Sequence, residues 1–251
     1  QSRGEVLCPM RGYTMAVGVR PFFTDLAGSV KALSRGGEGS YLNLRGHLRL
    51  PSDGIMWELY THVRTWDKVE WRIEYLPWSW SGIGHVPSEG NFAGVQFISY
   101  DPVDSRLDVS TFKIGADYDV SFSRELVFGP HADLHLIKWV QRVAKGGTDA
   151  TDFSQTIIHP TIGAHIRYDP VNTGYFSWFK PYVDGRFSWM SLSGLSLSTW
   201  DVGLGVAPPL SRNVDGGVKV GYKQWKMEGN RGRLFMDVGV EGFFTDLALR
   251  F

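Results

Sequence analysis

The chain has 251 residues, of which 43% are hydrophobic and 14% aromatic, and its 26 Lys and Arg residues balance its 26 Asp and Glu residues. This balance gives no general attraction to nucleic acid, and no apolar run reaches the roughly 18 residues that a membrane-spanning helix needs. The single cysteine, Cys8, excludes a disulfide framework and a cysteine metal cluster. Nothing between residues 10 and 251 has the composition of a linker, so we expect one domain, 1–251.

Apolar and polar residues alternate at period 2 along most of the chain, which predicts an all-β fold. In 69–75, for example, Val69, Trp71, Ile73 and Tyr75 alternate with Glu70, Arg72 and Glu74. We predict ten strands, at 12–24, 54–64, 69–81, 106–120, 125–139, 155–168, 173–189, 196–207, 214–226 and 233–251. Residues 24–53 and 91–100 leave room for further strands, so eight or twelve remain as alternatives.

The connections between these strands fall into two groups. Turn-forming residues cluster at 65–68, 121–125, 168–174 and 207–217, which we expect to be short turns at one end. Longer polar connections are expected at the other end, at 34–40, 83–105, 142–154, 192–196 and 228–232. Short turns on one rim and longer loops on the other are typical of an asymmetric barrel, and an even strand number puts both chain ends on the short-turn rim.

The alternation does not say which face lies inside. A soluble barrel of the lipocalin type has its charged face toward water and its apolar face toward a ligand cavity, whereas a transmembrane barrel has the reverse arrangement. Charges of both signs on nearly every strand favour the transmembrane barrel. Aromatic residues toward the strand ends favour it as interfacial girdles: Trp66, Tyr75, Trp78, Trp80, Tyr168, Trp189 and Trp225. For Trp78 and Trp80, a sugar-binding loop is the alternative.

The stretch 241–251, EGFFTDLALRF, has apolar residues alternating back from Phe251 through Leu249 and Leu247. This ending resembles that of bacterial outer-membrane β-barrel proteins, in which the pattern is the recognition signal for the barrel assembly machinery. The parity of the apolar residues shifts between Val240 and Leu247, which we interpret as a β-bulge at 241–244.

The resemblance implies a closed, antiparallel, up-and-down barrel in the bacterial outer membrane, with residues 1–10 as a short periplasmic segment. It implies outer-membrane lipid, lipopolysaccharide and the assembly machinery as partners, and leaves room for a protein partner at the loops or in the lumen. The start at Gln1 fits a mature chain whose export signal has been removed.

Deletion of Phe251 tests the interpretation of this ending. We expect the deletion to reduce assembly into the outer membrane while export of the chain stays intact, because it removes the assembly signal. The measurement is the amount of folded barrel in isolated outer membranes. Normal assembly of the truncated chain would contradict the interpretation.

The polar face of the barrel is expected to line the lumen. Its predicted members are Glu70, Arg72, Glu74, Lys113, Asp117, His131, Asp133, His135, His165, Arg167, Lys180, Asp184, Arg186, Lys219 and Lys223. Ten strands enclose a narrow lumen, and charges away from bulk solvent need partners. We therefore expect ion pairs to fill most of the lumen, with water in the gaps, and not a wide porin channel.

Histidines next to Asp133 are the best candidates for chemistry. Pairing across the connection at 142–155 is expected to bring Asp133 near His165, and such a cluster could serve base catalysis or hold a metal. The spacing of His131, Asp133 and His135 is nevertheless what any inward strand face produces, and the motifs of common hydrolases are absent from the sequence. We assign no catalytic residue, no metal and no cofactor.

Three classes of function follow. The first is a narrow channel or transporter for small polar or ionic solutes, which requires a water path past residues such as Arg72, Asp133 and Arg186. The second is a structural or partner-binding barrel with a sealed lumen, which acts through its long outer loops. The third is an outer-membrane hydrolase, and the chain is otherwise expected not to be an enzyme. Nucleic acid is not an expected partner.

Overall fold

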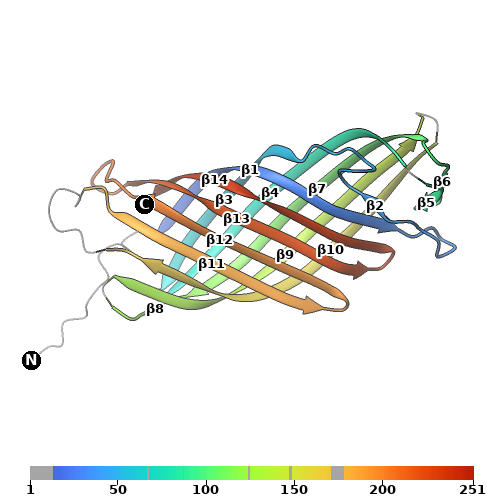
Figure 1. Ribbon diagram of the computed structural model, residues 1–251. Coiled ribbons are helices and arrows are strands. Elements are labelled where there is room, and N and C mark those ends of the chain that lie inside the picture. Colours follow the sequence, from blue (N-terminus) through green and yellow to red (C-terminus); the bar gives the residue numbers. More distant parts are fainter. Residues whose placement is uncertain (1–13, 67, 87, 124, 147–148, 171–177) are drawn as a thin grey trace, which may run out of the picture.

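Ten long antiparallel strands form a closed β-barrel in the computed structural model, which describes residues 14–66, 68–86, 88–123, 125–146, 149–170 and 178–251 (Figure 1). The long strands are β1 (Met15–Ala32), β3 (Asp53–Trp66), β4 (Val69–His85), β7 (Pro102–Tyr118), β9 (Leu126–Lys145), β10 (Asp149–Tyr168), β11 (Pro181–Leu192), β12 (Leu195–Val206), β13 (Asp215–Arg231) and β14 (Leu234–Arg250). Four short strands accompany them: β2 (Leu42–Asn43), β5 (Gly90–Phe92), β6 (Val95–Phe97) and β8 (Val120–Ser121). None of the described residues forms a helix long and apolar enough to span a membrane.

The barrel closes because β1 pairs with both β3 and the last strand, β14. Met15 lies opposite Val63 on one side, and Ala16 lies opposite Arg250 on the other. The predicted closed, antiparallel barrel of ten strands is therefore confirmed. The expected N-terminal segment at 1–10 and the first part of the predicted strand 173–189 lie outside the described residues.

Two of the connections that we expected to be long, at 192–196 and 228–232, are tight turns, and the strands that flank a third are longer than predicted. Strands β9 and β10 run to Lys145 and from Asp149, so the expected loop at 142–154 is mostly strand. Ser193 and Gly194 connect β11 and β12 with φ angles of 53° and 80°, the left-handed pair that a two-residue hairpin turn needs. Gly232 and Arg233 connect β13 and β14, and of these two residues only Gly232 has a positive φ angle, 61°. The polar residues that suggested loops belong to strands whose outer face is polar.

Strand β14 contains no bulge at 241–244, so that prediction is wrong. Val19 pairs with Leu247 and Leu26 pairs with Val240, seven residues further along both strands, so the register is unbroken. The even-numbered residues of β14 face inward throughout. What changes along the strand is the chemical character of each face.

This change divides the barrel into two halves. We call the half nearest the start of β1 and the end of β14 the basal half; it comprises residues 15–24, 57–66, 69–75, 111–118, 126–136, 160–168, 181–189, 199–206, 215–224 and 242–250. The remaining parts of the ten strands form the distal half. In the basal half, large apolar side chains point outward and are exposed, including Trp71, Ile73, Ile162, Leu204 and Leu247, while charged side chains point inward.

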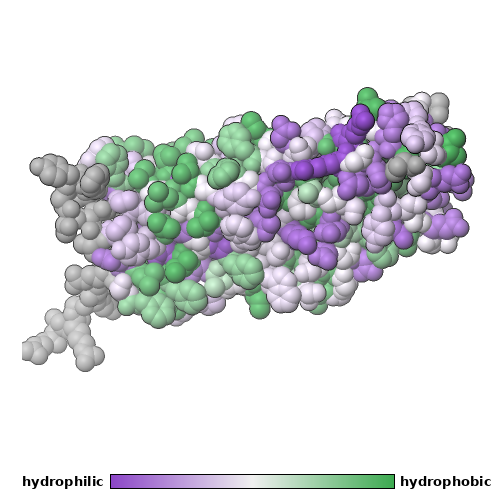
Figure 2. All heavy atoms as spheres, viewed as in Figure 1, coloured by the Kyte–Doolittle hydropathy of each residue, from purple (hydrophilic) through white to green (hydrophobic). Residues whose placement is uncertain are grey.

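In the distal half the two faces exchange their character. On β4 the inward residues Glu70, Arg72 and Glu74 are followed on the same face by Leu76, Trp78 and Trp80, all buried. Many outward residues of the distal half are polar and exposed, among them Ser79, Ser81, Asp104, Arg106, Lys138, Arg142, Lys226 and Glu228. Figure 2 shows the result, with apolar residues gathered over the basal half and hydrophilic residues over the distal half.

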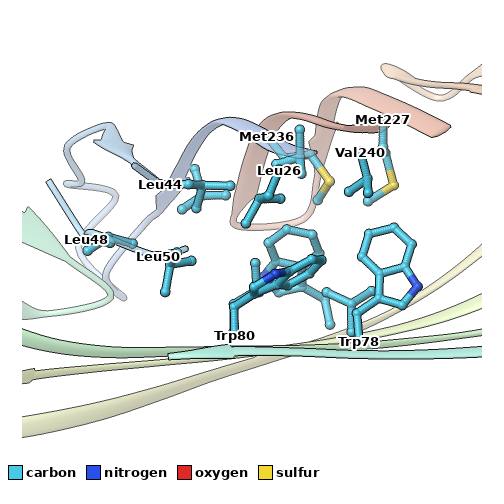
Figure 3. Close-up of a cluster of buried hydrophobic side chains, with 14 of the residues drawn as sticks. Leu26, Leu44, Leu48, Leu50, Trp78, Trp80, Met227, Met236 and Val240 are labelled. Atoms are coloured by element: carbon cyan, nitrogen blue, oxygen red, sulfur yellow. The ribbon is translucent and has the colours of Figure 1, made fainter. Parts of the chain in front are cut away.

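The distal half is a two-layer sandwich, because the wall of the barrel parts in two places. The β3–β4 pairing ends at Leu59–Tyr75, and the β10–β11 pairing ends at Ile162–Trp189. Beyond these points β4, β7, β9 and β10 form one sheet, and β11 to β14 with β1 and β3 form the other. Apolar side chains from both sheets meet between them in the main hydrophobic core. Figure 3 shows Trp78 and Trp80 facing Met227, Met236 and Val240 across this core.

Residues 42–50, which we call the inward segment, complete this core between β1 and β4. Leu42, Leu44, Leu48 and Leu50 are buried in the main core. Figure 3 shows Leu44, Leu48 and Leu50 at the end of this core where Leu26 lies. The hydroxyl of Ser105 on β7 donates to the carbonyl of Leu48 over 3.0 Å. The carbonyl oxygens of His47 and Arg49 lie so close to Gly84 and Gly82 of β4 that a Cβ atom at either glycine would overlap them. The range 24–53, which we left open, is thus a longer β1 followed by this segment.

The range 91–100, which we also left open, contains a small separate hairpin. Its strands β5 and β6 pair through Gly90–Phe97, Asn91–Gln96 and Phe92–Val95. Phe92 and Phe97 are buried in the main core, and the N–H of Ala93 donates to the carbonyl of Ala32 at the distal end of β1. The hairpin therefore packs onto the distal end of the sandwich.

Candidate functional site: the charged interior of the basal half

Nearly all of the predicted lumen residues lie on the inner face of the basal half. Residues Glu70, Arg72, Glu74, Lys113, Asp117, His131, Asp133, His135, His165, Arg167, Asp184, Arg186, Lys219 and Lys223 are buried or partly buried there. Lys180 precedes β11 at the basal end of the barrel, where its Nζ lies 2.7 Å from Asp215. The ion pairs of these residues form two clusters.

The first cluster surrounds Arg72, whose side chain is 0% exposed. Its guanidinium contacts Glu74 at 3.0 Å, Asp117 at 2.9 Å and Asp133 at 2.6 Å. Arg186 binds the second oxygen of Asp117 at 2.6 Å, and Lys113 binds the second oxygen of Glu74 at 2.5 Å. We call these six residues the Arg72 cluster; three cations face three carboxylates, so their charges balance.

The second cluster surrounds Arg20 on β1. Arg20 contacts Glu58 at 2.7 Å and Asp246 at 3.0 Å, and the hydroxyl of Tyr60 donates to Asp246 over 2.6 Å. Lys223 pairs with the other oxygen of Glu58. Nearby, Lys219 reaches Asp184 at 2.9 Å.

Three residues of this second cluster, Arg20, Tyr60 and Asp246, are not among the predicted lumen residues. Their positions along the strands could have identified them, because every second residue of a strand lies on the same face. Each occupies the same face of its strand as other inward residues: Arg20 follows Ala16 and Gly18, and Asp246 follows Phe244.

Asp133 and His165 do not form the predicted pair, and the histidine beside Asp133 is His131, whose Nε2 lies 3.6 Å from Asp133 Oδ2. In the β9–β10 pairing, Asp133 lies opposite Thr161, and His165 lies opposite Gly129. Asp133 binds Arg72 instead, and His165 Nε2 lies 2.8 Å from Asp119. The prediction that Asp133 and His165 meet is therefore wrong.

Asp117, His131 and His165 place one ligand atom each within 4.8 Å of one another, which is close enough to share a metal ion. The surrounding charges argue against this use. Both oxygens of Asp117 already accept from guanidinium groups, Oδ1 from Arg72 and Oδ2 from Arg186. Two arginines at this distance repel a cation, and a metal would have to displace them. The geometry instead fits an interior held together by ion pairs.

Water-sized spaces remain between the charged side chains. One cavity of about 90 Å³ is lined by residues that include Arg20, Tyr60, Arg64, Asp117 and Arg186. A smaller one of about 30 Å³ lies where the charged interior meets the apolar core, among residues that include Glu74, Lys113, His135, Lys223 and Trp225. These cavities leave room for water in the basal half.

The aromatic residues divide between the two faces. Trp66, Tyr75, Tyr168 and Trp189 are exposed on the outside, as a girdle requires. Trp78, Trp80 and Trp225 are buried inside the distal half, so their assignment to the girdle is wrong, and so is the sugar-binding loop proposed for Trp78 and Trp80. The sequence could have predicted this, because Trp78 and Trp80 lie at even-numbered positions of β4, on the same inward face as Arg72 and Glu74.

The distal connection before β7 is fixed to the barrel by Asp101. Its carboxylate lies 2.7 Å from Lys145 Nζ and accepts from the N–H of Ile98 over 2.7 Å. The hydrogen bond from Lys145, followed by that from Ile98, lowers the pKa of Asp101. The contact therefore favours the ionised carboxylate and anchors residues 98–101 to the end of β9.

Comparison with known proteins supports the fold. No protein-family model and no curated protein matches the chain. Among solved structures, the outer membrane protease OmpT from Escherichia coli is similar with a TM-score of 0.53 and 9% identity, covering 97% of this chain and 99% of that one. Neisserial surface protein A has a TM-score of 0.36 and 14% identity, covering 95% of this chain and 97% of that one. The toluene transporter TodX of Pseudomonas putida has a TM-score of 0.30 and 10% identity, covering 97% and 91%.

The similarity in fold to OmpT agrees with the geometry of the barrel itself. A closed sheet leaves no unpaired edge in hydrocarbon, and the outward apolar surface of the basal half is the surface that lipid requires. The chain is therefore a closed β-barrel whose basal half carries the outward apolar belt of a membrane-spanning barrel.

Proposed function

We propose that this protein is a sealed outer-membrane barrel with a structural or partner-binding role, acting through its distal half. The observation that carries this proposal is the apolar core that fills the distal half between its two sheets. Trp78, Trp80, Trp139 and Trp225 belong to that core, together with the leucines of the inward segment.

The dimensions of the barrel support a role for the distal half outside the bilayer. Strand β9 has 20 residues, which corresponds to a length of about 65 Å. At a tilt of about 40° it rises about 50 Å, whereas the apolar band of such barrels is roughly 25 Å tall. The polar outer face of the distal half is therefore available to a partner in the surrounding water.

The charged basal interior would suit an ion channel, which was our first expectation from the sequence. An ion that passed the Arg72 cluster would next have to enter the apolar core, where an unpaired charge has a large desolvation cost. The ion pairs themselves are largely satisfied within the barrel. The sealed barrel is consequently favoured over the channel. The His and Asp residues that an enzyme could use lie in the basal interior, away from the distal end.

Single-channel recording in planar bilayers tests the proposal. We expect the folded protein, and its Arg186→Ala and Asp133→Ala variants, to give no discrete conductance steps, because the apolar core blocks ions above these residues. Folding of each sample is checked by its heat-dependent migration in electrophoresis. Discrete steps whose ion selectivity changes in the two variants would instead establish a pore lined by the charged face.

A further inference from the structure

A groove of about 760 Å³ crosses the outer wall of the basal half, at the seam where β1 and β14 close the barrel. It extends over β13, β14, β1, β3 and β4, so it follows the curved wall across five of the ten long strands. Neighbouring strands lie about 4.8 Å apart, which gives the groove a length of about 19 Å from β13 to β4. It begins beside Gly216, at the basal end of β13, and ends beside Tyr75, where the basal half of β4 ends. The groove therefore rises obliquely through the apolar belt.

The floor of the groove consists of small side chains. Val17 and Val19 on β1 and Thr61 on β3 point outward, and all three are half-buried. Their neighbours across the sheet are larger: Val17 lies opposite Leu249 and Val19 lies opposite Leu247, and both leucines are exposed. The difference in side-chain size makes the depression.

The hydroxyl groups along the groove have partners within the barrel. The hydroxyl of Thr61 donates to the carbonyl oxygen of Ala16 over 3.1 Å, and the hydroxyl of Tyr60 donates to Asp246 on the inner face. The groove thus presents apolar surface to an occupant. It is continuous with the apolar belt, whose outer surface faces hydrocarbon.

The connection between β12 and β13 forms the basal end of the groove. The N–H groups of Leu210 and Ser211 donate to the carbonyl oxygen of Val214 over 2.9 and 3.0 Å, and Leu210 Cδ1 lies 3.2 Å from the position of a Cβ on Gly216. Arg212 belongs to the same turn, is exposed, and forms no ion pair with the residues that the structure describes. Two residues of chain span at most about 7 Å, so the guanidinium can reach the basal end of the groove, where the belt ends and lipid head groups begin.

We propose that this groove binds one phospholipid of the leaflet at the basal end, with an acyl chain along the groove and the phosphate at Arg212. A hydrocarbon core about 30 Å thick gives each leaflet about 15 Å, and an acyl chain that spans this depth obliquely matches a groove of about 19 Å. Guanidinium groups bind phosphate through paired, charge-assisted hydrogen bonds. The site goes beyond the sealed barrel proposed above and is independent of it, since the groove lies outside the lumen.

A second copy of the chain fits the groove poorly. The groove curves around the wall, and another barrel is rigid and convex, so it would touch the exposed leucines and leave Val17 and Val19 uncovered. Association of proteins in lipid depends on close packing. A flexible acyl chain can follow the curve and fill the floor.

Mass spectrometry of the intact complex tests the site. The full chain is folded in detergent micelles that contain phosphatidylglycerol, and the lipids that stay on the chain after removal of the micelle are counted. We expect one phosphatidylglycerol per chain, and we expect Val19→Trp to abolish its retention because the indole fills the floor of the groove. Val220→Trp is the matched control: Val220 is 54% exposed on the outward face of β13 and lies outside the groove, so retention should be unchanged.

Two results would overturn the groove as a lipid site. One is a wild-type chain without retained lipid, or equal retention in the two tryptophan variants. The other is a mass of two chains that Val19→Trp reduces to one, which would assign the groove to a second copy. Folding of each variant is checked by its heat-dependent migration in electrophoresis.

Diacylglycerol, which has the same acyl chains without the phosphate, tests the role of Arg212. We expect the wild-type chain to retain phosphatidylglycerol about tenfold better than diacylglycerol, the effect of one charge-assisted hydrogen bond, and Arg212→Gln to remove this preference. Arg106→Gln, which changes an exposed arginine of the distal half, should keep it. Equal retention of the two lipids by the wild-type chain would overturn the phosphate site at Arg212.

Discussion

Replacement of Arg72 by Met is expected to lower the free energy of unfolding by about 3–5 kcal/mol, the usual cost of removing one partner from a buried ion pair. Arg72 is fully buried and contacts Glu74, Asp117 and Asp133. Methionine keeps most of the volume of the side chain but leaves Asp133, whose Oδ1 lies 2.6 Å from Arg72, without its cation. The measurement is denaturant unfolding of the barrel in lipid vesicles, followed by tryptophan fluorescence.

The Arg106→Met variant is the matched control. Arg106 also binds a carboxylate, Asp108 at 2.8 Å, but it lies on the outer face of the distal half with 62% of its side chain exposed. An exposed pair of this kind contributes about 0–1 kcal/mol. Equal losses in the two variants would show that burial does not determine the strength of the Arg72 cluster. A double variant, Arg72→Met with Asp133→Asn, should lose less than the sum of the single losses, because it removes both members of a pair.

Replacement of Leu48 by Ala is expected to lower the free energy of unfolding by about 2–5 kcal/mol, the range for truncating a buried leucine. Leu48 is 0% exposed and belongs to the inward segment, whose backbone is fixed by Ser105, Gly82 and Gly84. A truncated side chain there leaves a cavity that this constrained backbone cannot easily close. Denaturant unfolding is the primary measurement, and proteolysis of the connection between β1 and β3 reports on the segment itself.

The control for this variant is Leu210→Ala. Leu210 lies in the basal connection between β12 and β13 and is 62% exposed, so its truncation is expected to change stability by less than about 0.5 kcal/mol. If Leu48→Ala were equally mild and left protease sensitivity unchanged, the inward segment would not be part of the core.

The fold and the residues of the basal interior were largely predictable, because the two-residue alternation of a β-strand determines both the strand and its inward face. Alternation through residues such as Glu70, Arg72 and Glu74 gives the strand and its inward face together, and a transmembrane barrel requires every strand to close on its neighbours. Ten strands follow from counting these segments. The pairing of β1 with β14 follows from closure.

The distal half was not predictable in the same way, because the rule that apolar residues face outward holds only in lipid. Leu234, Met236, Val238 and Val240 are apolar and alternate perfectly, yet they face inward because their level of the barrel is surrounded by water. The lipocalin-like arrangement that we weighed against the transmembrane one describes this half correctly. Both arrangements occur on the same strands.

Register was the second limit. Strands β9 and β10 extend through most of the expected loop at 142–154, and their register determines which residues lie beside His165. Polar residues such as Arg142 and Asp152 suit a loop and the wet face of a strand equally well. Composition alone cannot separate the two.

The exchange of faces also fixes how deep the molecule sits. If the barrel shifted inward along the membrane normal, Lys138 and Arg106 would enter hydrocarbon, where a charge on the lipid face costs about 2–4 kcal/mol at the midplane. If it shifted outward, Trp71 and Ile162 would be exposed to water. Each strand has a point at which its outward face changes from apolar to polar. Together these points fix the depth of the barrel in the membrane and restrict its movement along the membrane normal.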